Sequence, residues 1–508
     1  MSFTRLNLMI EESLNNHKDE PCYWWQGDWY TCQDLLNLID DCEAKLKRAG
    51  FAEAEGQRLV VMSKNSPMIP ALSIAAWRLG GNICPLNISA GLESLADTID
   101  LLEPFAVIVA GESKSGVLEA LEAQGKEKGW SCVTCELGEK IPEFKSKPAS
   151  PETKDYAVIF ATSGTTGAPK AVPLTHGNLI DQCEKVSEFV TPLAPRDVFL
   201  TVLPNFHSFG YTCATMLPLS MNARIAIVPS FLPPQAAMKA IIEAKVNVTY
   251  AVPAIFSFLL NAVERGKFPK EALSRQKYLC AGGDRLNPKL HEQALHLIGK
   301  DIVEGYGLTE TSPVVSMTRN YETNRQGTTG PVLTGYEYKL RSRDGQDLNP
   351  EEHEGVLWVK GKSVTPGYFR APRITAERFD DGWFNTGDYV RLEDGYVRIL
   401  DRVTDILIVG GFNVYPQEVE KVLTEHPDVE AAIVVGVPHP VNGEIPKAFI
   451  HRRDGSDLTD RELIKFAKEK LAHYKVPRAI EFVDEFPLSG TGKILRRLLR
   501  EQSGKKSL

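Results

Sequence analysis

The segment Thr162-Ser-Gly-Thr-Thr-Gly-Ala-Pro-Lys170 combines hydroxyl side chains, two glycines and one lysine within nine residues. It follows the apolar run Tyr156–Phe160, which has the composition of a buried strand, and precedes a second short apolar run, Ala171–Leu174. Glycines let the backbone approach a ligand closely, hydroxyls and backbone N–H groups donate to oxyanions, and Lys170 supplies a positive charge. The segment therefore predicts a polyphosphate-binding loop that joins two strands.

The Walker loop of kinases and ATPases, G-x-x-x-x-G-K-[ST], is the main alternative, and the segment departs from it. Pro169 separates Gly167 from Lys170, and no Ser or Thr follows the lysine to hold magnesium. The next helix is expected only later, with its cap at Thr175. A flexible surface loop rich in glycine and threonine is the other alternative, and the segment alone does not exclude it.

Up to about residue 400, apolar runs with strand character alternate with helical patterns. Runs such as Arg58–Met62 and Phe105–Ala110 favour α/β layers with buried, mainly parallel strands. Glu354–Lys360 is bounded by turn residues and predicts a strand of a β-rich subdomain. The apolar stretch Ala251–Val263 is too short to span a bilayer and contains Pro253, so we expect a buried helix and no integral membrane segment.

The residues after about position 405 predict a separate small α+β unit. Pro416 is expected to open a helix, and the apolar segments Val429–Val437 and Ala448–His451 are expected to form strands. Thr459 and Glu462 have the spacing of a capping box for a further helix. These signals agree with one another and predict an independent unit.

Composition narrows the class of protein. A chain of 508 residues is too long for one core, so at least two domains are expected, and a net charge of −8 argues against non-specific nucleic-acid binding. Glu11 and Glu12 lie where a signal peptide would need an apolar core, so we expect no secretion signal. The nine cysteines are scattered and suggest free thiols in a reducing compartment, the cytoplasm. The pair Cys132 and Cys135 lacks the second pair or βαβ context that a zinc or redox site requires.

Further motifs follow the phosphate loop along nearly the whole chain. They are Asn205-Phe-His-Ser-Phe-Gly210, Ala281-Gly-Gly-Asp284, Tyr306-Gly-Leu-Thr-Glu-Thr311, Trp383-Phe-Asn-Thr-Gly-Asp388, Asp401-Arg402 with Glu420, and Pro487-Leu-Ser-Gly-Thr-Gly-Lys493. Together with the loop they resemble the adenylate-forming superfamily, which includes acyl- and aryl-CoA ligases, acyl-carrier-protein synthetases, peptide-synthetase adenylation domains and luciferases. The likeness to acyl-CoA and acyl-carrier-protein ligases is the greatest.

This resemblance implies an α/β fold in two parts. Residues 1–400 would form a large N-terminal AMP-binding domain of two α/β subdomains plus a β-rich subdomain. Residues 401–405 would form a hinge, where the composition also changes, and residues 406–508 a small mobile α+β C-terminal domain that caps the site.

The resemblance also implies an ATP-dependent carboxylic-acid ligase of the acyl-CoA synthetase type. Such an enzyme forms an acyl-adenylate and pyrophosphate from an acid and Mg²⁺-bound ATP, then transfers the acyl group to a thiol and releases AMP. Coenzyme A is the favoured acceptor. The phosphopantetheine of an acyl carrier protein is the alternative, because Phe206–Gly210 and Glu304–Glu310 also look like acyl-carrier-protein synthetases. A non-catalytic nucleotide-binding relative is an alternative of another class, although such a protein usually loses at least one site residue.

The resemblance also implies a role for each residue of this chain that matches a family motif. The expected ATP-binding residues are Thr162, Ser163, Gly164, Thr165, Thr166, Gly167, Lys170, Gly282, Gly283, Asp284, Glu304, Gly305, Tyr306, Gly307, Asp388 and Arg402. The expected catalytic residues are Lys493, His207, Thr309 and Glu310, with Glu310 also the magnesium ligand and Thr404 in the hinge. A carboxylate suits Mg²⁺, and a lysine cation would stabilise the anions that meet when a carboxylate attacks an α-phosphate. Taken alone, Glu310 would be read as a solvated acid, Asp388 as a turn residue and Lys493 as part of a solvated basic helix.

His207 limits the choice of acid. Relatives that activate amino acids place an aspartate at this position to pair with the substrate ammonium, and a buried ammonium without such a partner is disfavoured. We therefore expect an uncharged apolar acyl or aryl acid. The chain departs from the common family pattern at a few positions, which are Ala171, Asp284, Arg285, Asp401 and Thr404.

Overall fold

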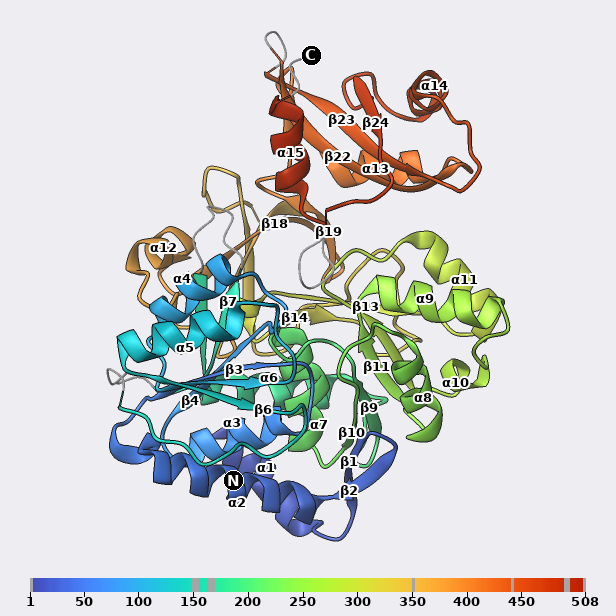
Figure 1. Cartoon of the computed structure of the whole chain (residues 1–508). Coiled ribbons are helices and arrows are strands. Elements are labelled where there is room, and N and C mark those ends of the chain that lie inside the picture. Colours follow the sequence, from blue (N-terminus) through green and yellow to red (C-terminus); the bar gives the residue numbers. More distant parts are fainter. Residues whose placement is uncertain are drawn as a thin grey trace. The chain divides into compact units, whose positions relative to one another are not determined.

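The computed structural model describes residues 3–148, 155–162, 170–349, 352–439, 443–487 and 494–505. Its internal contacts divide the chain into two compact units, Met1–Glu337 with Val359–Phe384 and Tyr338–Trp358 with Asn385–Leu508 (Figure 1). Within the described ranges, no helix is long and apolar enough to cross a membrane. The hinge at residues 401–405 and the domain limits on either side of it stay predictions.

The first unit contains a six-stranded sheet with helices on both faces (Figure 1). Alternate residues of β3 face opposite sides: Leu59 and Val61 join the core that contains α3, whereas Val60 and Met62 pack with α4 and α5. Strands that are buried on both faces need continuous apolar runs, and such runs are the pattern by which the sequence predicts these strands. In spatial order the strands are β6 (Ser131–Cys135), β5 (Ala106–Ala110), β3 (Arg58–Ser63), β4 (Asn82–Leu86), β7 (Tyr156–Thr162) and β8 (Lys170–Thr175), all parallel to their neighbours except the antiparallel pair β7 and β8.

The second sheet of this unit has eight strands and carries part of the predicted site. The inner strands β13 to β1 run parallel, and the outer strands β14 and β2 run antiparallel to their neighbours. Carboxyl ends of parallel strands meet at one edge of a sheet, where α/β proteins bind their ligands. In spatial order the strands are β14 (Val314–Met317), β13 (Val303–Gly307), β12 (Tyr278–Ala281), β11 (Val248–Ala251), β9 (Val198–Thr201), β10 (Arg224–Ile227), β1 (Pro21–Trp25) and β2 (Asp28–Thr31).

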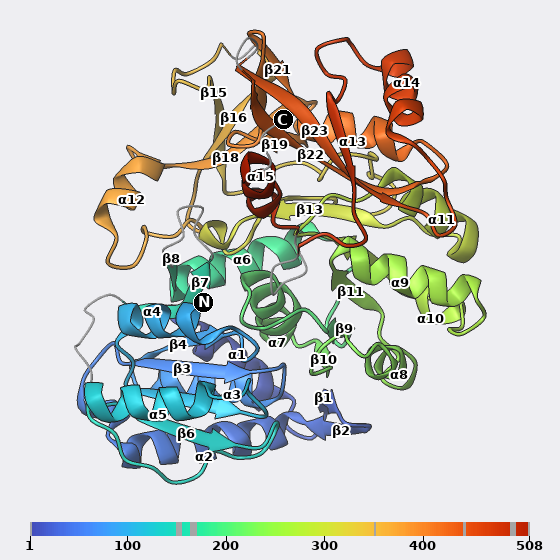
Figure 2. The ribbon, with the colours of Figure 1, turned by 45° about the horizontal axis from the view of Figure 1, so that its top comes forward.

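Helices flank both sheets of the first unit. Figures 1 and 2 both show α8, α9 and α11 beside the eight-stranded sheet. The helix expected from the apolar stretch at 251–263 is α9, and Ala251 itself ends β11. The α-helices of this unit are α1 (Leu6–Asn16), α2 (Cys32–Ala49), α3 (Met68–Arg78), α4 (Leu92–Leu102), α5 (Val117–Lys128), α6 (His176–Phe189), α7 (Leu217–Ser220), α8 (Gln235–Glu243), α9 (Pro253–Glu264), α10 (Glu271–Ser274), α11 (Pro288–Ile298) and α12 (Pro372–Arg378).

A five-stranded, β-rich sheet has most of its residues in the second unit. Its strand β16 spans Glu354–Lys360, the residues predicted from the sequence. Strands β18 and β19 are antiparallel neighbours, so residues far apart along the hairpin become cross-strand pairs. The other strands are β15 (Glu337–Arg341), β17 (Phe379–Asp380), β18 (Trp383–Glu393) and β19 (Tyr396–Arg402).

The C-terminal part of the second unit is a sheet between helices (Figure 2). Val434 and Ile450 pack with α13 and α14, whereas Val435 and Phe449 pack with Leu499 of α15. The predicted capping box is present, and β23 begins earlier than predicted because it pairs with the long β22. The elements are β20 (Leu407–Val409), β21 (Phe412–Val414), α13 (Pro416–Thr424), β22 (Val429–His439), β23 (Gly443–Arg452), α14 (Asp460–Lys470), β24 (Ala479–Phe482) and α15 (Arg496–Lys505).

All nine cysteines are free thiols, as predicted, and seven of them are buried. The other two, Cys132 and Cys135, are half-buried residues of β6. A spacing of three along a strand points their side chains to opposite faces, so the C-x-x-C sequence builds no common site. Burial raises the pKa of both thiols to about 11.

Candidate active site

The β7–β8 hairpin holds both ends of the predicted phosphate loop. Thr162 and Lys170 lie opposite each other in the strand register, and the Thr162 hydroxyl donates to the Lys170 carbonyl over 3.4 Å. The following helix α6 begins only after the N-cap Thr175. The predicted strand–loop–strand arrangement is therefore confirmed, which distinguishes this loop from a Walker loop. The loop residues between the strands, Ser163, Gly164, Thr165, Thr166 and Gly167, lie outside the described residues.

Lys170 and the predicted metal ligand Glu310 meet at a third side chain, Tyr368, which sequence reasoning missed. The Tyr368 hydroxyl donates to Glu310 Oε1 over 2.7 Å, and its ring centroid lies 5.9 Å from Lys170 Nζ. The next residue, Phe369, donates its backbone N–H to the Ala171 carbonyl over 2.8 Å. The phosphate loop and the segment that carries Glu310 are thus joined by one aromatic side chain.

Glycines lie at the ends of β12 and β13, where other parts of the chain approach closely. A Cβ on Gly282 would lie 3.0 Å from the ring of Phe209, and a Cβ on Gly307 would lie 1.8 Å from the Pro313 carbonyl oxygen. No larger residue fits at Gly307 without moving backbone. The remaining predicted residues here are Gly283 and Asp284 in the turn after β12, and Gly305 and Tyr306 within β13.

A hydrogen bond joins the segment of His207 to the segment of Thr309. The hydroxyls of Ser208 and Thr309 lie 3.3 Å apart, and both side chains are buried. The His207 ring is half-buried, and its Nδ1 accepts the Phe209 backbone N–H over 3.4 Å. An eight-residue π-helix, Phe209–Met216, follows directly. Such helices are rare and occur often at functional sites.

Glu304 is buried behind this edge of the sheet, in contact with a histidine that the sequence did not indicate. His291 Nδ1 lies 2.6 Å from Asp301 Oδ1, and His291 Nε2 lies 3.6 Å from Glu304 Oε1. Burial would lower the pKa of His291, but the hydrogen bond to Asp301 and the charge of Glu304 outweigh it and raise that pKa to about 9. The protonated His291 ring therefore lies between the half-buried Asp301 and the buried Glu304.

Asp388 and Arg402 meet in the second unit. They are cross-strand partners in β18 and β19, and Arg402 Nε lies 2.6 Å from Asp388 Oδ1. The Asp388 side chain is only 3% exposed, and its backbone N–H donates to the Thr386 hydroxyl over 3.1 Å. The predicted ribose-binding pair is thus brought together by strand pairing. Thr404 is exposed in the turn after β19, and Lys493 lies outside the described residues.

Comparison with known proteins settles the family. Residues 10–369 match the model of the AMP-binding enzymes, and residues 418–493 match the model of their C-terminal domain. The chain belongs to the AMP-binding enzyme family. The predicted superfamily, the α/β fold with a small second domain, and the class of AMP-forming acid–thiol ligase are thereby confirmed.

Relatives of this AMP-binding enzyme cover almost its whole length. A long-chain-fatty-acid–CoA ligase of Haemophilus influenzae is 31% identical over 97% of this chain and 94% of its own. A feruloyl-CoA synthase of Amycolatopsis is 32% identical over 94% of this chain and 95% of its own. The crystal structure of ATP-bound MatB from Rhodopseudomonas palustris has a TM-score of 0.86 at 28% identity, covering 98% of this chain and 99% of that one.

Asp401, the first residue of the predicted hinge, is a buried carboxyl group of this enzyme. It accepts backbone N–H groups of Arg402 over 2.9 Å and of Gln417 over 3.1 Å. Burial raises its pKa to about 7, and the charge of Arg496 only partly offsets this effect. An unfolded aspartate titrates near pH 4, so the folded chain holds this proton more tightly. The stabilising contribution is complete below about pH 4 and is lost as the pH rises to about 7.

We predict that Asp401→Asn removes this pH dependence. Between about pH 4 and pH 7 the variant should gain stability relative to the wild type by up to about 1.4 kcal/mol per pH unit, because only the wild type must ionise a buried group. Urea unfolding of both proteins at several pH values measures the difference. A difference that is the same at pH 4.5 and pH 7.5 would contradict the raised pKa.

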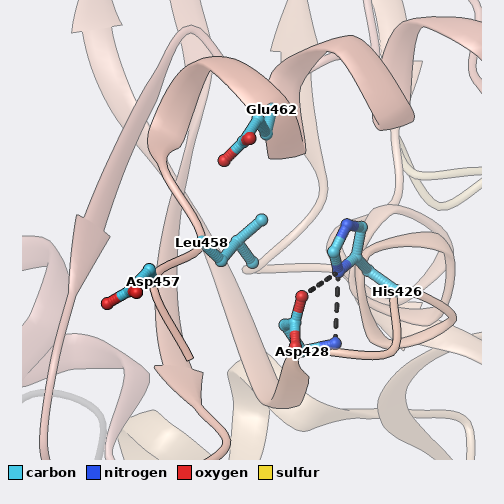
Figure 3. A pocket seen from close by; sticks show the side chains of 5 residues that line it. All are labelled: His426, Asp428, Asp457, Leu458 and Glu462. Atoms are coloured by element: carbon cyan, nitrogen blue, oxygen red, sulfur yellow. Dashed lines mark hydrogen bonds and ion pairs between the residues drawn. The ribbon is translucent and has the colours of Figure 1, made fainter. Parts of the chain in front are cut away.

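A pocket in the second unit contains none of the predicted site residues. Figure 3 shows its lining residues, which are His426, Asp428, Asp457, Leu458 and Glu462. The Glu462 carboxylate accepts the Thr459 backbone N–H over 2.9 Å, and His426 Nδ1 accepts the Asp428 backbone N–H over 3.2 Å. These groups therefore cap α14 and hold the turn before β22.

Proposed function

We propose that this AMP-binding enzyme activates an uncharged acyl or aryl carboxylic acid with ATP and transfers the acyl group to coenzyme A. In the first step the carboxylate attacks the α-phosphate, which forms the acyl-adenylate and releases pyrophosphate. In the second step the thiol attacks the adenylate carbonyl and AMP leaves. The hydrogen bond between Ser208 and Thr309 supports the proposal, because it joins the segment of His207, which we assign to the acid, to the segment of Thr309, which we assign to the nucleotide.

The proposed roles follow from the chemistry of each group. Lys170 and the hydroxyls of its loop bind the β- and γ-phosphates, since a lysine ammonium is a compact charge for a polyphosphate. Tyr306 packs on adenine beside the backbone of Gly283. Asp388, held by Arg402, accepts the ribose hydroxyls. His207 borders the acid, and Lys493 supplies the cation between carboxylate and α-phosphate.

Magnesium fits this donor set. Among the described residues, no group of three or more His, Cys, Asp or Glu side chains could hold a metal ion. Mg²⁺ does not need such a cage, because it keeps waters and is bound by one or two carboxylates together with substrate phosphates. We propose that Glu310 is the protein ligand, with Thr309 beside it on the phosphate. Bound Mg²⁺ neutralises charge on the phosphates and the leaving pyrophosphate.

An apolar acid is favoured over an amino acid. Position 207 is histidine, so that position has no carboxylate to pair with a substrate ammonium, and the neighbouring Phe209 ring lies against Gly282. Fatty acids and ferulate, named for the two ligases above, are acids of this kind. Those relatives are CoA ligases, which supports coenzyme A over an acyl carrier protein. The free thiols favour the cytoplasm as the compartment.

We predict that the purified enzyme forms AMP and pyrophosphate only with a suitable acid and with Mg²⁺ present. A panel of fatty, aryl and amino acids tests the proposal. Each acid is assayed with coenzyme A, with phosphopantetheinylated carrier protein and with neither. Apolar acids should exceed amino acids, and coenzyme A should exceed carrier protein. Formation of ADP would identify a kinase-like reaction. Binding of ATP without turnover across the panel would favour the non-catalytic alternative.

A further inference from the structure

We infer that Tyr368 is a positioning residue that holds both the magnesium ligand Glu310 and the phosphate-loop lysine Lys170. The inference rests on the proposed function, since it concerns how that site binds Mg²⁺-bound ATP. Tyr368 belongs to none of the motifs that pointed to the family. It acts through two other side chains and is not assigned contact with substrate.

The hydroxyl of Tyr368 fixes one carboxylate oxygen of Glu310. It donates to Oε1 over 2.7 Å, while within the described part of the chain Oε2 accepts no hydrogen bond. A carboxylate held at one oxygen presents the other in a defined direction. Groups that orient a metal-binding side chain in this way typically change metal affinity or activity by about 10- to 100-fold when removed. The hydroxyl therefore orients Glu310 toward the metal.

The ring of Tyr368 lies against Lys170. The distance of 5.9 Å from Nζ to the ring centroid is that of a cation–π contact. The ammonium is thus held against an aromatic ring, and in the described part of the chain it forms no ion pair. Tyr368 thereby positions both charged groups: its ring contacts the Lys170 ammonium, and its hydroxyl binds the Glu310 carboxylate.

The backbone around Tyr368 is itself fixed. The Thr365 backbone N–H donates to the Glu310 carbonyl over 2.8 Å, and the Tyr368 N–H donates to the Thr375 hydroxyl over 2.9 Å. Gly367 has φ +136°, and a Cβ there would lie 2.7 Å from Thr375. Only glycine fits this turn, so the backbone that carries Tyr368 has little freedom to shift. Tyr368 is 7% exposed.

Two substitutions separate the two contacts. Tyr368→Phe keeps the ring and removes the hydroxyl, so we expect the Mg²⁺ concentration that gives half-maximal adenylate formation to rise about 10-fold or more. ATP binding without Mg²⁺ should change little. Tyr368→Leu also removes the ring and should in addition weaken Mg²⁺-free ATP binding severalfold. Calorimetry of ATP binding with and without Mg²⁺ provides the readout that does not depend on turnover.

Tyr336→Phe is the matched control. The Tyr336 hydroxyl donates to the backbone carbonyl of Thr311, the residue after Glu310, over 2.8 Å. The substitution therefore removes a tyrosine hydroxyl close to Glu310 but leaves the Glu310 carboxylate and its hydrogen bond in place. This variant should keep the wild-type Mg²⁺ dependence. An equal Mg²⁺ dependence of Tyr368→Phe and the wild type would overturn the inference. If the wild type formed no adenylate with any acid, the proposed function would fail, while calorimetry of Mg²⁺-dependent ATP binding would still decide the role of Tyr368.

Discussion

Lys493→Ala is expected to slow adenylate formation by about 10²- to 10³-fold, the scale of one lost transition-state donor, and to leave thioester formation near the wild-type rate. The first half-reaction brings a carboxylate and an α-phosphate together, so it needs a cation between them. The second half-reaction is attack of a sulfur on a mixed anhydride and has no such need. Lys493 lies late in the predicted C-terminal domain, which by the family resemblance we expect to present different faces in the two steps.

The test needs both half-reactions on one protein preparation. Pyrophosphate exchange measures the first step, and thioester formation from synthetic acyl-adenylate and coenzyme A measures the second. Arg497→Ala is the control, because Arg497 is an exposed cation of the same basic segment, paired with Glu501 over 2.9 Å. Equal losses in both half-reactions would show that Lys493 is structural or that the domain does not rotate about residues 401–405.

Glu420→Ala is expected to destabilise the second unit by up to about 3 kcal/mol, the lower limit for breaking a buried ion pair, because this pair is only partly buried. Arg496 of α15 binds both carboxylate oxygens of Glu420, one of them over 2.8 Å, and the side chains are 22% and 12% exposed. The same carboxylate accepts the Val434 backbone N–H over 2.7 Å, while Arg496 donates to the Val434 carbonyl over 3.0 Å. Three elements, α13, β22 and α15, therefore depend on one pair.

Hydrogen exchange of the amides in β22 measures this loss directly. Their protection should fall in Glu420→Ala and stay unchanged in Arg497→Ala, because an exposed i,i+4 pair contributes only about 0.3–0.5 kcal/mol. Replacing both Glu420 and Arg496 by methionine should recover part of the protection, since neither charge is then left unpaired. Unchanged protection in Glu420→Ala would mean that apolar packing alone holds α15.

Short sequence patterns predicted those helices and strands whose formation depends on neighbouring residues alone. The Thr459–Glu462 capping box, the strand at Glu354–Lys360 and the strand–loop–strand at the phosphate loop each follow from a short pattern, and each is present. The basic helix is different. From composition alone it would be read as solvated, yet Arg496 and Arg500 bind Glu420 and Asp405. Those partners lie far away in sequence, so no local pattern identifies them.

The same limit applies to the candidate site. The family motifs indicated Lys170 and Glu310, but the residue that joins them follows a Pro366-Gly367 turn, and such turns are too common to mark a site. Nothing near His291 predicts its two carboxylate partners, because their meeting depends on how α11 packs beside β13. The sequence also does not predict the π-helix at Phe209–Met216, because its apolar residues fit an ordinary α-helix equally well.

The burial of the cysteines makes the proposed rotation measurable with fluorescent dyes. Maleimides react with thiolates, and seven native thiols are shielded while Cys132 and Cys135 hold their protons at neutral pH. Cysteines introduced at Arg373 in the first unit and Arg497 in the second, where the native side chains are 91% and 59% exposed, should therefore label selectively. Energy transfer between the two dyes would then follow the interdomain distance with ATP, with acyl-adenylate and with coenzyme A, in a chain that keeps all its own thiols.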